Sequence, residues 1–505
     1  MNEEGYGVAV WIQSAEPEGL VHSIWANRYS TSEGWAGPVQ VSSTEGLDCT
    51  VARAAVDPQG NIIVVWTSFG NGAFNIWSIR YSVGEGWGVA EPIDPSPTVS
   101  TLLADVVCDS NGNAFAFWLE YGAVKSSRYV DGVGWGPAES VSTHGGYAQP
   151  ASFGVDSHGN AIAVWYDGGD YNSAMHRIWC NRYVVGVGWG LDELLMSAPG
   201  VANPSVVVDD AGNAVALWFE PKSDAGFAPR DVWSSRFTVG AGWGSPEMIE
   251  GITNYLWSMN LAGDGSGNAI AVFEELDTIT TSFHLWTKKY SPLTGWSPKV
   301  EVGTSGFSPA IDINHDGLAV LIWLEWNQGT VSSSRCTPQT DWTQPELVGT
   351  EGSQDLCIAV DGNGNAIAAW MLYDERSNIY GNEYGVPLEV ISATVAIKPE
   401  ALNPGSMGKW ITAYIELPEG FEISDVVVDS IRLNGQFPAT GPSDFVDYDK
   451  DKVKELMVKF DLQSVLHTCP EIVGKTFTAT ITGTLTSGIM FEGSDTITLL
   501  APRSR

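Results

Sequence analysis

One repeated phrase constrains the fold of this chain more than any other feature. A typical copy contains an acidic turn, a Gly-Asn pair, an alternating apolar run and a closing aromatic residue, as in Asp57, Gly60, Asn61 and Trp66. The copies begin at residues 2, 57, 109, 156, 209, 264, 314 and 361. They recur about every 45 to 55 residues, which is the size of a four-stranded propeller blade. The repetition predicts an all-β fold of the β-propeller class.

Each repeat divides into four strands. In the copy at Asp209, residues 206–208 form strand one, and residues 209–212 form a tight turn in which Gly can take the left-handed conformation. Residues 214–218 alternate small and large side chains, as strand two of a packed blade does, and residues 232–237 form strand three. A Gly-Trp pair opens strand four. No helical periodicity interrupts the series.

The count of repeats favours eight blades, with seven as the alternative. Strand two occurs eight times, whereas the Gly-Trp strand occurs seven times, so we expect residues 384–391 to supply a shortened last strand. The chain starts inside a repeat, because Asn2 already occupies the turn. The missing strand is either lost upstream with a signal peptide or replaced by strand exchange between the termini. The closing aromatics should be buried at equivalent positions: Trp11, Trp66, Trp118, Trp165, Trp218, Phe273, Trp323 and Trp370.

The composition limits the classes of partner. With 60 acidic and 25 basic residues the net charge is -35, which disfavours nucleic acid and anionic membrane surfaces. No apolar run approaches the length of about 20 residues that a membrane helix needs, so we expect no membrane insertion. The six cysteines show no metal-binding spacing. We interpret them as small buried apolar residues, with disulfides as the alternative.

A second domain is predicted from residue 391 to residue 505, after a propeller of repeats of about 48 residues over 1–390. The Gly-Trp phrase disappears there, and short apolar runs alternate with Gly, Pro and Asp turns, which is typical of a small Ig-like β-sandwich. Residues 408–420, 431–435 and 491–495 resemble a module found at the ends of secreted and surface proteins of archaea and bacteria. The resemblance implies an extracellular or cell-surface location and no activity.

An acidic loop in this second domain is the candidate metal site. Alternate residues of a tight loop bring their oxygens to one point, and Ca²⁺ takes six to eight oxygen ligands. Lys452 stands where such loops usually have glycine, so a turn capped by Asp is the alternative. The calcium ligands predicted by the spacing are Asp447, Asp449, Asp451 and Glu455.

The Asp-turn phrase of the propeller repeats distantly resembles the Asp-box hairpins of sialidase-like propellers, which also place Asp, Gly and an aromatic around a turn. It departs from them because the Ser or Thr before Asp and the Thr before Trp are absent. Those boxes are structural, so no sialidase activity follows.

Two further series recur across the repeats. A cation precedes an aromatic in strand three, as in Arg80 and Tyr81, and its regular use indicates architecture. Carboxylates also recur two residues after the strand-two aromatic, and we expect an arc around one mouth of the channel or a set of loop anchors. They are Glu120, Asp167, Glu220, Glu275 and Glu325.

Recognition should occur where the repeats differ, because variable loops on a rigid scaffold carry binding. The loops after strand two vary most, and the ligand-binding residues predicted there are Asp167, Tyr171, Glu220 and Glu275. The favoured function is a non-catalytic extracellular binding or adhesion protein for carbohydrate or a surface protein. A carbohydrate-active hydrolase or lyase is an alternative, because propellers host such chemistry. A structural surface-layer component is another. The sequence shows no Ser-His-Asp order, zinc motif or phosphate loop.

Overall fold

The computed structural model divides into two compact units. The first comprises Met1–Ser334 and Pro345–Gly385, and the second Arg335–Gln344 and Val386–Arg505, so the chain leaves the first unit five residues before the predicted boundary at residue 390. The structure describes residues 1–500 apart from 15–20, 43–46, 71, 95–100, 144–147, 149–151, 169–174, 224–227, 327–328, 339, 350–353, 373–377, 385–389, 400, 403–409, 419, 435–436, 442, 449, 451–452, 469–475 and 486–489.

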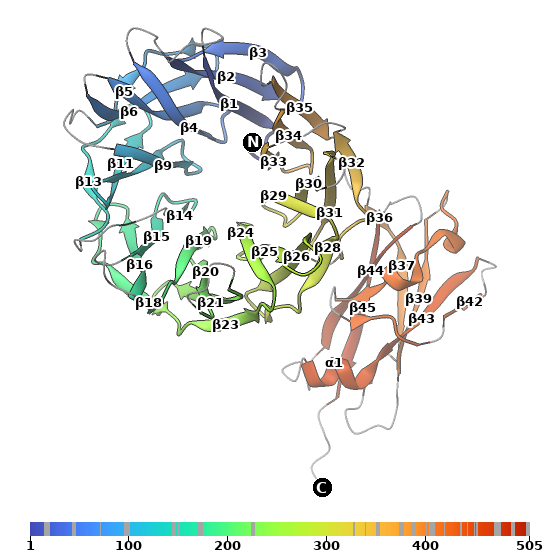
Figure 1. Cartoon of the computed structure of the whole chain (residues 1–505). Coiled ribbons are helices and arrows are strands. Elements are labelled where there is room, and N and C mark those ends of the chain that lie inside the picture. The colour runs from blue at the N-terminus through green and yellow to red at the C-terminus, as the bar shows by residue number, and fades with distance from the viewer. Residues whose placement is uncertain are drawn as a thin grey trace. The chain divides into compact units, whose positions relative to one another are not determined.

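The first unit is a β-propeller, and its described residues form eight separate sheets in chain order around a ring (Figure 1). The first four sheets contain β1 (Tyr6–Ser14), β2 (His22–Ser30) and β3 (Gly34–Gln40); β4 (Asp48–Val56), β5 (Ile62–Gly70), β6 (Ala73–Ser82), β7 (Gly86–Trp87) and β8 (Glu91–Pro92); β9 (Thr101–Cys108), β10 (Ala114–Glu120), β11 (Ala123–Val130), β12 (Gly134–Trp135) and β13 (Glu139–Ser140); and β14 (Ser152–Val155), β15 (Ala161–Asp167), β16 (Met175–Val184), β17 (Gly188–Trp189) and β18 (Glu193–Pro199).

The other four sheets continue the same order. They contain β19 (Ala202–Val208), β20 (Ala214–Pro221), β21 (Arg230–Thr238), β22 (Gly242–Trp243) and β23 (Glu247–Gly251); β24 (Tyr255–Gly263), β25 (Ala269–Asp277), β26 (Ser282–Ser291), β27 (Gly295–Trp296) and β28 (Val300–Gly303); β29 (Gly306–Ile313), β30 (Ala319–Glu325), β31 (Val331–Cys336) and β32 (Glu346–Gly349); and β33 (Gln354–Val360), β34 (Ala366–Leu372) and β35 (Asn378–Tyr384). The all-β propeller class is therefore confirmed.

The repeated turn phrase makes one hydrogen-bonded structure. In the second sheet, Oδ1 of Asp57 accepts the amides of Gln59 and Asn61 at 3.0 and 2.8 Å, and Oδ2 accepts the Asn61 side chain at 2.8 Å. Gly60 has a φ of 83°, which a side chain would strain. The carboxylate thus satisfies the turn that joins strands one and two, and the structural interpretation of this Asp is confirmed.

Strand two of the later repeats lies in the core between sheets. Trp118, Trp218 and Trp323 are fully buried, as predicted. Trp11 is only partly buried, contrary to the prediction. The reason is that β1 has a single strand neighbour among the described residues, β2, whereas strand two of every other sheet lies between two strands.

The strand-three cations link neighbouring sheets. The Arg28 guanidinium lies 4.0 Å from the ring centre of Tyr81, and Arg80 lies 5.1 Å from that of Tyr129. Arg80 also reaches Asp57 of its own turn at 3.4 Å. Arg80 therefore joins its own turn to the aromatic of the next repeat, as Arg128 does with Asp109 and Tyr183, which confirms the architectural role of these cations.

The predicted shortened last strand is wrong in its second half. Val390 and Ile391 belong to β36 (Val390–Ser392), which pairs in parallel with β45 (Met490–Leu499) of the second unit, so these apolar residues contribute to another sheet. Residues 385–389 lie outside the described part of the chain.

The second unit is a β-sandwich of two sheets around one apolar core (Figure 1). Besides β36 and β45, its elements are β37 (Thr394–Lys398), β38 (Ala401–Leu402), β39 (Trp410–Glu416), η1 (Ile423–Asp425), η2 (Val428–Ser430), β40 (Arg432–Leu433), β41 (Phe437–Pro438), β42 (Asp444–Val446), β43 (Glu455–Asp461), α1 (Leu462–Thr468) and β44 (Thr476–Thr484). One sheet has the order β36-β45-β44-β40-β41 with β38 paired to β45, and the other has the order β37-β39-β43-β42. No helix in the described ranges is long and apolar enough to cross a membrane.

Candidate functional site

The predicted binding face is the one where strand two ends, opposite the Asp turns. Asp167 ends β15 and is buried, with Arg177 Nη1 3.4 Å from Oδ2. Glu275, near the end of β25, is 2% exposed, and its Oε1 lies 2.9 Å from Lys299 Nζ. Both carboxylates therefore hold their own sheet together, as loop anchors do. Ligand contact at these two residues stays a prediction.

Of the other two predicted binding residues, the structure describes Glu220. Glu220, near the end of β20, is partly buried, and this burial raises the pKa of its carboxyl group. Tyr171 lies outside the described residues. The structure therefore places Asp167, Glu220 and Glu275 at equivalent points of three successive sheets.

An aromatic cluster on this face was missed by the sequence reasoning. Trp257 and Trp326 are each 52% exposed. All 22 tryptophans lie in the described part of the chain, and the other 20 are buried or half-buried. They pack around Phe283 of β26 and Phe307 of β29. We name Trp257, Phe283, Phe307 and Trp326 the aromatic shelf. The signal in the sequence was that both tryptophans lie outside the repeating Trp positions.

The rings of the aromatic shelf hold one another in tilted and edge-to-face contacts. The Phe283 ring centre lies 5.8 Å from that of Trp257 and 4.9 Å from that of Trp326. Phe307 lies 5.1 Å from Trp326 at an interplanar angle of 84°. These distances are those of favourable aromatic pairs. The shelf is therefore a packed surface contributed by the sixth and seventh sheets.

Local backbone features place the two tryptophans. Pairing of β24 with β25 shifts register between Leu256 and Ser258, and the bulge leaves Trp257 between them. Trp326 follows β30 directly, and its amide donates to the Ser305 carbonyl at 2.9 Å. Both side chains therefore stand at strand ends on the variable face, on backbone fixed by sheet pairing.

Two hydrogen-bonded carboxylates lie beside the aromatic shelf. Glu274 is buried, and its Oε2 accepts Ser258 Oγ at 2.5 Å. Burial raises the pKa of the Glu274 carboxyl group, and hydrogen bonds from Ser258 and the Ser308 backbone oppose the shift. Glu325 accepts the indole N–H of Trp323 at 2.7 Å and also binds Ser305. Both carboxylates are thus bonded to serines that adjoin the shelf, because Ser258 follows Trp257 in the chain and the Ser305 carbonyl accepts the Trp326 amide.

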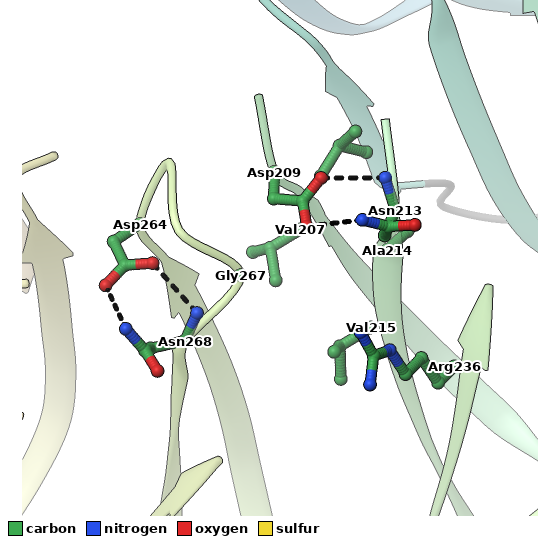
Figure 2. Close-up of a pocket in the computed structure, with 10 residues that line it drawn as sticks. Val207, Asp209, Asn213, Ala214, Val215, Arg236, Asp264, Gly267 and Asn268 are labelled. Carbon is green, nitrogen blue, oxygen red and sulfur yellow. Dashed lines mark hydrogen bonds between the residues drawn. The ribbon is translucent and has the colours of Figure 1, made fainter. Parts of the chain in front are cut away.

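A small pocket on the opposite face is explained by architecture. It lies between the Asp209 turn of the fifth sheet and the Asp264 turn of the sixth (Figure 2). Asp209 and Asp264 each bind the backbone amide and the side-chain amide of the Asn four residues later. Arg236 donates to the Pro292 carbonyl at 3.2 Å. The polar atoms of the pocket are therefore engaged in the turns and in the contact between sheets.

The described part of the calcium loop contains only part of the predicted ligand set. Asp449 and Asp451 lie outside the described residues, and Asp447 is exposed. Glu455 is buried, and its Oε2 accepts the Tyr448 amide at 2.7 Å. Within the described ranges, no three His, Cys, Asp or Glu side chains are arranged to hold a metal ion. Calcium binding stays a prediction.

Comparison with known proteins finds no matching family model and no matching curated protein. Among solved structures, a puromycin hydrolase shares 13% identity at a TM-score of 0.45 over 74% of this chain and 57% of its own. The polysaccharide lyase Uly1 shares 9% at 0.44, over 69% and 91%. A PL25 ulvan lyase shares 10% at 0.40, over 75% and 90%. This chain therefore spans just over half of the hydrolase. The activities named belong to those proteins.

Proposed function

We propose that the propeller binds carbohydrate on the face where strand two ends, and that the aromatic shelf is its contact surface. The observation that carries the proposal is the exposure of Trp257 and Trp326, 52% each, in a protein whose other tryptophans are buried or half-buried. Large exposed aromatics mark binding sites because leaving them in water forgoes burial free energy.

The chemistry of the aromatic shelf suits a sugar. A pyranose ring presents C–H groups on its faces and hydroxyl groups around its edge, so it packs on an aromatic ring while its hydroxyls bind polar neighbours. Trp257 and Trp326 supply the rings, and Glu325 and Ser305 supply polar atoms next to them. The packing around Phe283 holds the rings in place before binding, which lowers the entropic cost of association.

Glycan binding to single and double variants tests the proposal. We expect Trp257→Ala and Trp326→Ala each to weaken the affinity for a glycan found on an array by about 10- to 100-fold, or about 1.4 to 2.8 kcal/mol. Isothermal titration calorimetry measures the change. Val187→Ala is the matched control, because this exposed side chain lies in the β16–β17 turn. Full affinity of the double tryptophan variant would contradict the proposal.

A carbohydrate-active enzyme is the second candidate, and Glu274 favours it. A buried carboxyl group with a raised pKa, next to an aromatic surface, is the environment of a general acid in glycoside cleavage. If the protein cleaves the glycan it binds, Glu274→Gln should keep the affinity and lower the rate of release of new chain ends at least 100-fold. Binding without product, or full turnover by this variant, would exclude this role.

A further inference from the structure

A serine, a histidine and a glutamate form a hydrogen-bonded line at the tip of the β25–β26 hairpin. Ser282 Oγ lies 3.0 Å from His284 Nε2, and His284 Nδ1 lies 2.7 Å from Glu301 Oε1. No sequence motif relates the three residues, because Glu301 comes 17 residues after His284. Their order, hydroxyl to imidazole to carboxylate, is that of an activated serine nucleophile.

Sheet geometry brings the three residues together. Ser282 and His284 are two apart on β26, so their side chains lie on the same face of the strand, while Phe283 of the aromatic shelf points to the other face. β28 pairs with β26 and places Glu301 opposite Trp286, with a register shift at Leu285. His284 lies two residues before Trp286 on the same face, so Glu301 is its diagonal cross-strand neighbour and its carboxylate reaches the ring.

The contacts favour one tautomer of the imidazole. Glu301 can only accept when it is ionised, so Nδ1 carries the proton and donates to it. Nε2 is then free to accept the Ser282 hydroxyl proton. Thr280 Oγ1 lies 2.6 Å from Ser282 Oγ and can donate to it. His284 thus has the orientation that a general base requires, and Glu301 acts as its positioning residue.

We propose that Ser282 is a nucleophile for acyl transfer and that the hairpin tip hydrolyses carboxylic esters. Ser282 Oγ attacks the ester carbonyl carbon while its proton moves to His284 Nε2. The tetrahedral intermediate expels the alcohol, which takes that proton, and leaves an acyl-serine. Water then attacks the acyl carbon and gives a proton to His284, and the second tetrahedral intermediate releases the acid as that proton returns to Ser282 Oγ. Water is the only co-reactant, and no electrons are exchanged.

The position of the site indicates which esters it accepts. The side chains of His284 and Glu301 are 27% and 33% exposed, so the reacting atoms are reached from solvent at a strand end. Such a site accepts a small ester, or an acyl group carried on the outside of a larger molecule. Its specificity for an ester therefore does not depend on enclosing the substrate in a deep pocket. The proposal is independent of carbohydrate binding, because it uses the other face of β26.

Labelling with a fluorophosphonate probe tests the nucleophile directly. The full chain should become labelled, and peptide mapping by mass spectrometry should place the adduct on Ser282, which needs no variant. Ser282→Ala should lose the label, and His284→Ala should lower the labelling rate at least 100-fold, the contribution of a general base. The same variants should lower hydrolysis of p-nitrophenyl acetate in parallel. Glu301→Gln should lower both rates at least 10-fold.

Matched controls separate the site from general reactivity. Ser291 ends the same strand, and its Oγ accepts the Leu293 amide at 3.3 Å, so Ser291→Ala should label as the wild type does. Val187→Ala, at an exposed turn position of the fourth sheet, should also leave labelling unchanged. An unlabelled wild type, an adduct mapped to another residue, or equal rates for wild type and His284→Ala would overturn the proposal.

Discussion

At the scale of single residues, side chains on the inner strands connect one sheet to the next. Ser152 Oγ accepts the Val206 amide at 3.0 Å, and Asn260 Nδ2 donates to the Pro309 carbonyl at 3.2 Å. These residues stand four positions before their turn Asp, and Asp105 holds the equivalent position in the third sheet. Oδ1 of Asp105 accepts the amide of Val106, the next residue of the same strand. Burial raises the pKa of Asp105 to about 6, and Arg53 opposes the shift.

The raised pKa predicts a pH dependence of stability. The folded state holds the Asp105 proton up to about pH 6, whereas an ordinary Asp loses it near 3.8. The free energy of unfolding should therefore fall as pH rises from about 4 to 6. Asp105→Asn should remove this fall and stabilise the protein at pH 7 by about 1 to 3 kcal/mol.

Urea unfolding of wild type and Asp105→Asn at pH 4 and pH 7 measures the effect. Glu85→Gln, at an exposed turn position, is the control and should leave the pH dependence unchanged. An Asp105→Asn protein that is less stable than the wild type at pH 7 would show that the charged form is favoured in the fold.

At the scale of elements, register shifts recur in the inner strands and shape the predicted binding face. Register shifts in β4, β19, β29 and β33 accompany positive φ angles at Val51, Asn203, Ser308 and Asp355, between 44° and 53°. A bulge bends a strand and re-aims its side chains. In β24 the equivalent shift falls at Trp257. The aromatic shelf is therefore a local use of an architectural feature.

Burial within these elements predicts which tryptophans stabilise the fold. Trp165 of β15 is 2% exposed in the core between the third and fourth sheets, so Trp165→Ala should cost about 3 to 5 kcal/mol. Trp257→Ala removes an exposed ring and should leave the melting temperature almost unchanged. Differential scanning calorimetry compares the two. Equal melting temperatures for Trp165→Ala and wild type would contradict the assignment of this core.

At the scale of the whole propeller unit, the ring closes through contacts between the first and last sheets. The Gly362 amide, in the turn of the last sheet, donates to the Glu3 carbonyl at 3.0 Å. On its other side the first turn is joined to the second sheet, because the Asn2 side chain donates to the Asp57 carbonyl at 2.7 Å. Several of the 25 basic side chains contact a neighbouring sheet, as those of Arg28 and Arg80 do. The net charge of -35 gives the protein a negative electrostatic potential, which repels anions. We therefore expect an uncharged glycan to bind better than an anionic one.

The sequence by itself determined the fold class, because the repeat period, the Asp turns and the alternation of strand two are local patterns that sheet formation obeys. It also identified the architectural cations and the variable face. Only the tertiary structure decided the burial of Glu275, the exposure of Trp257 and Trp326, and the line from Ser282 through His284 to Glu301. These depend on register shifts and on neighbouring strands, which no periodicity in one segment encodes. The same limit applies to Val390 and Ile391, whose partner strand lies about 100 residues further along the chain.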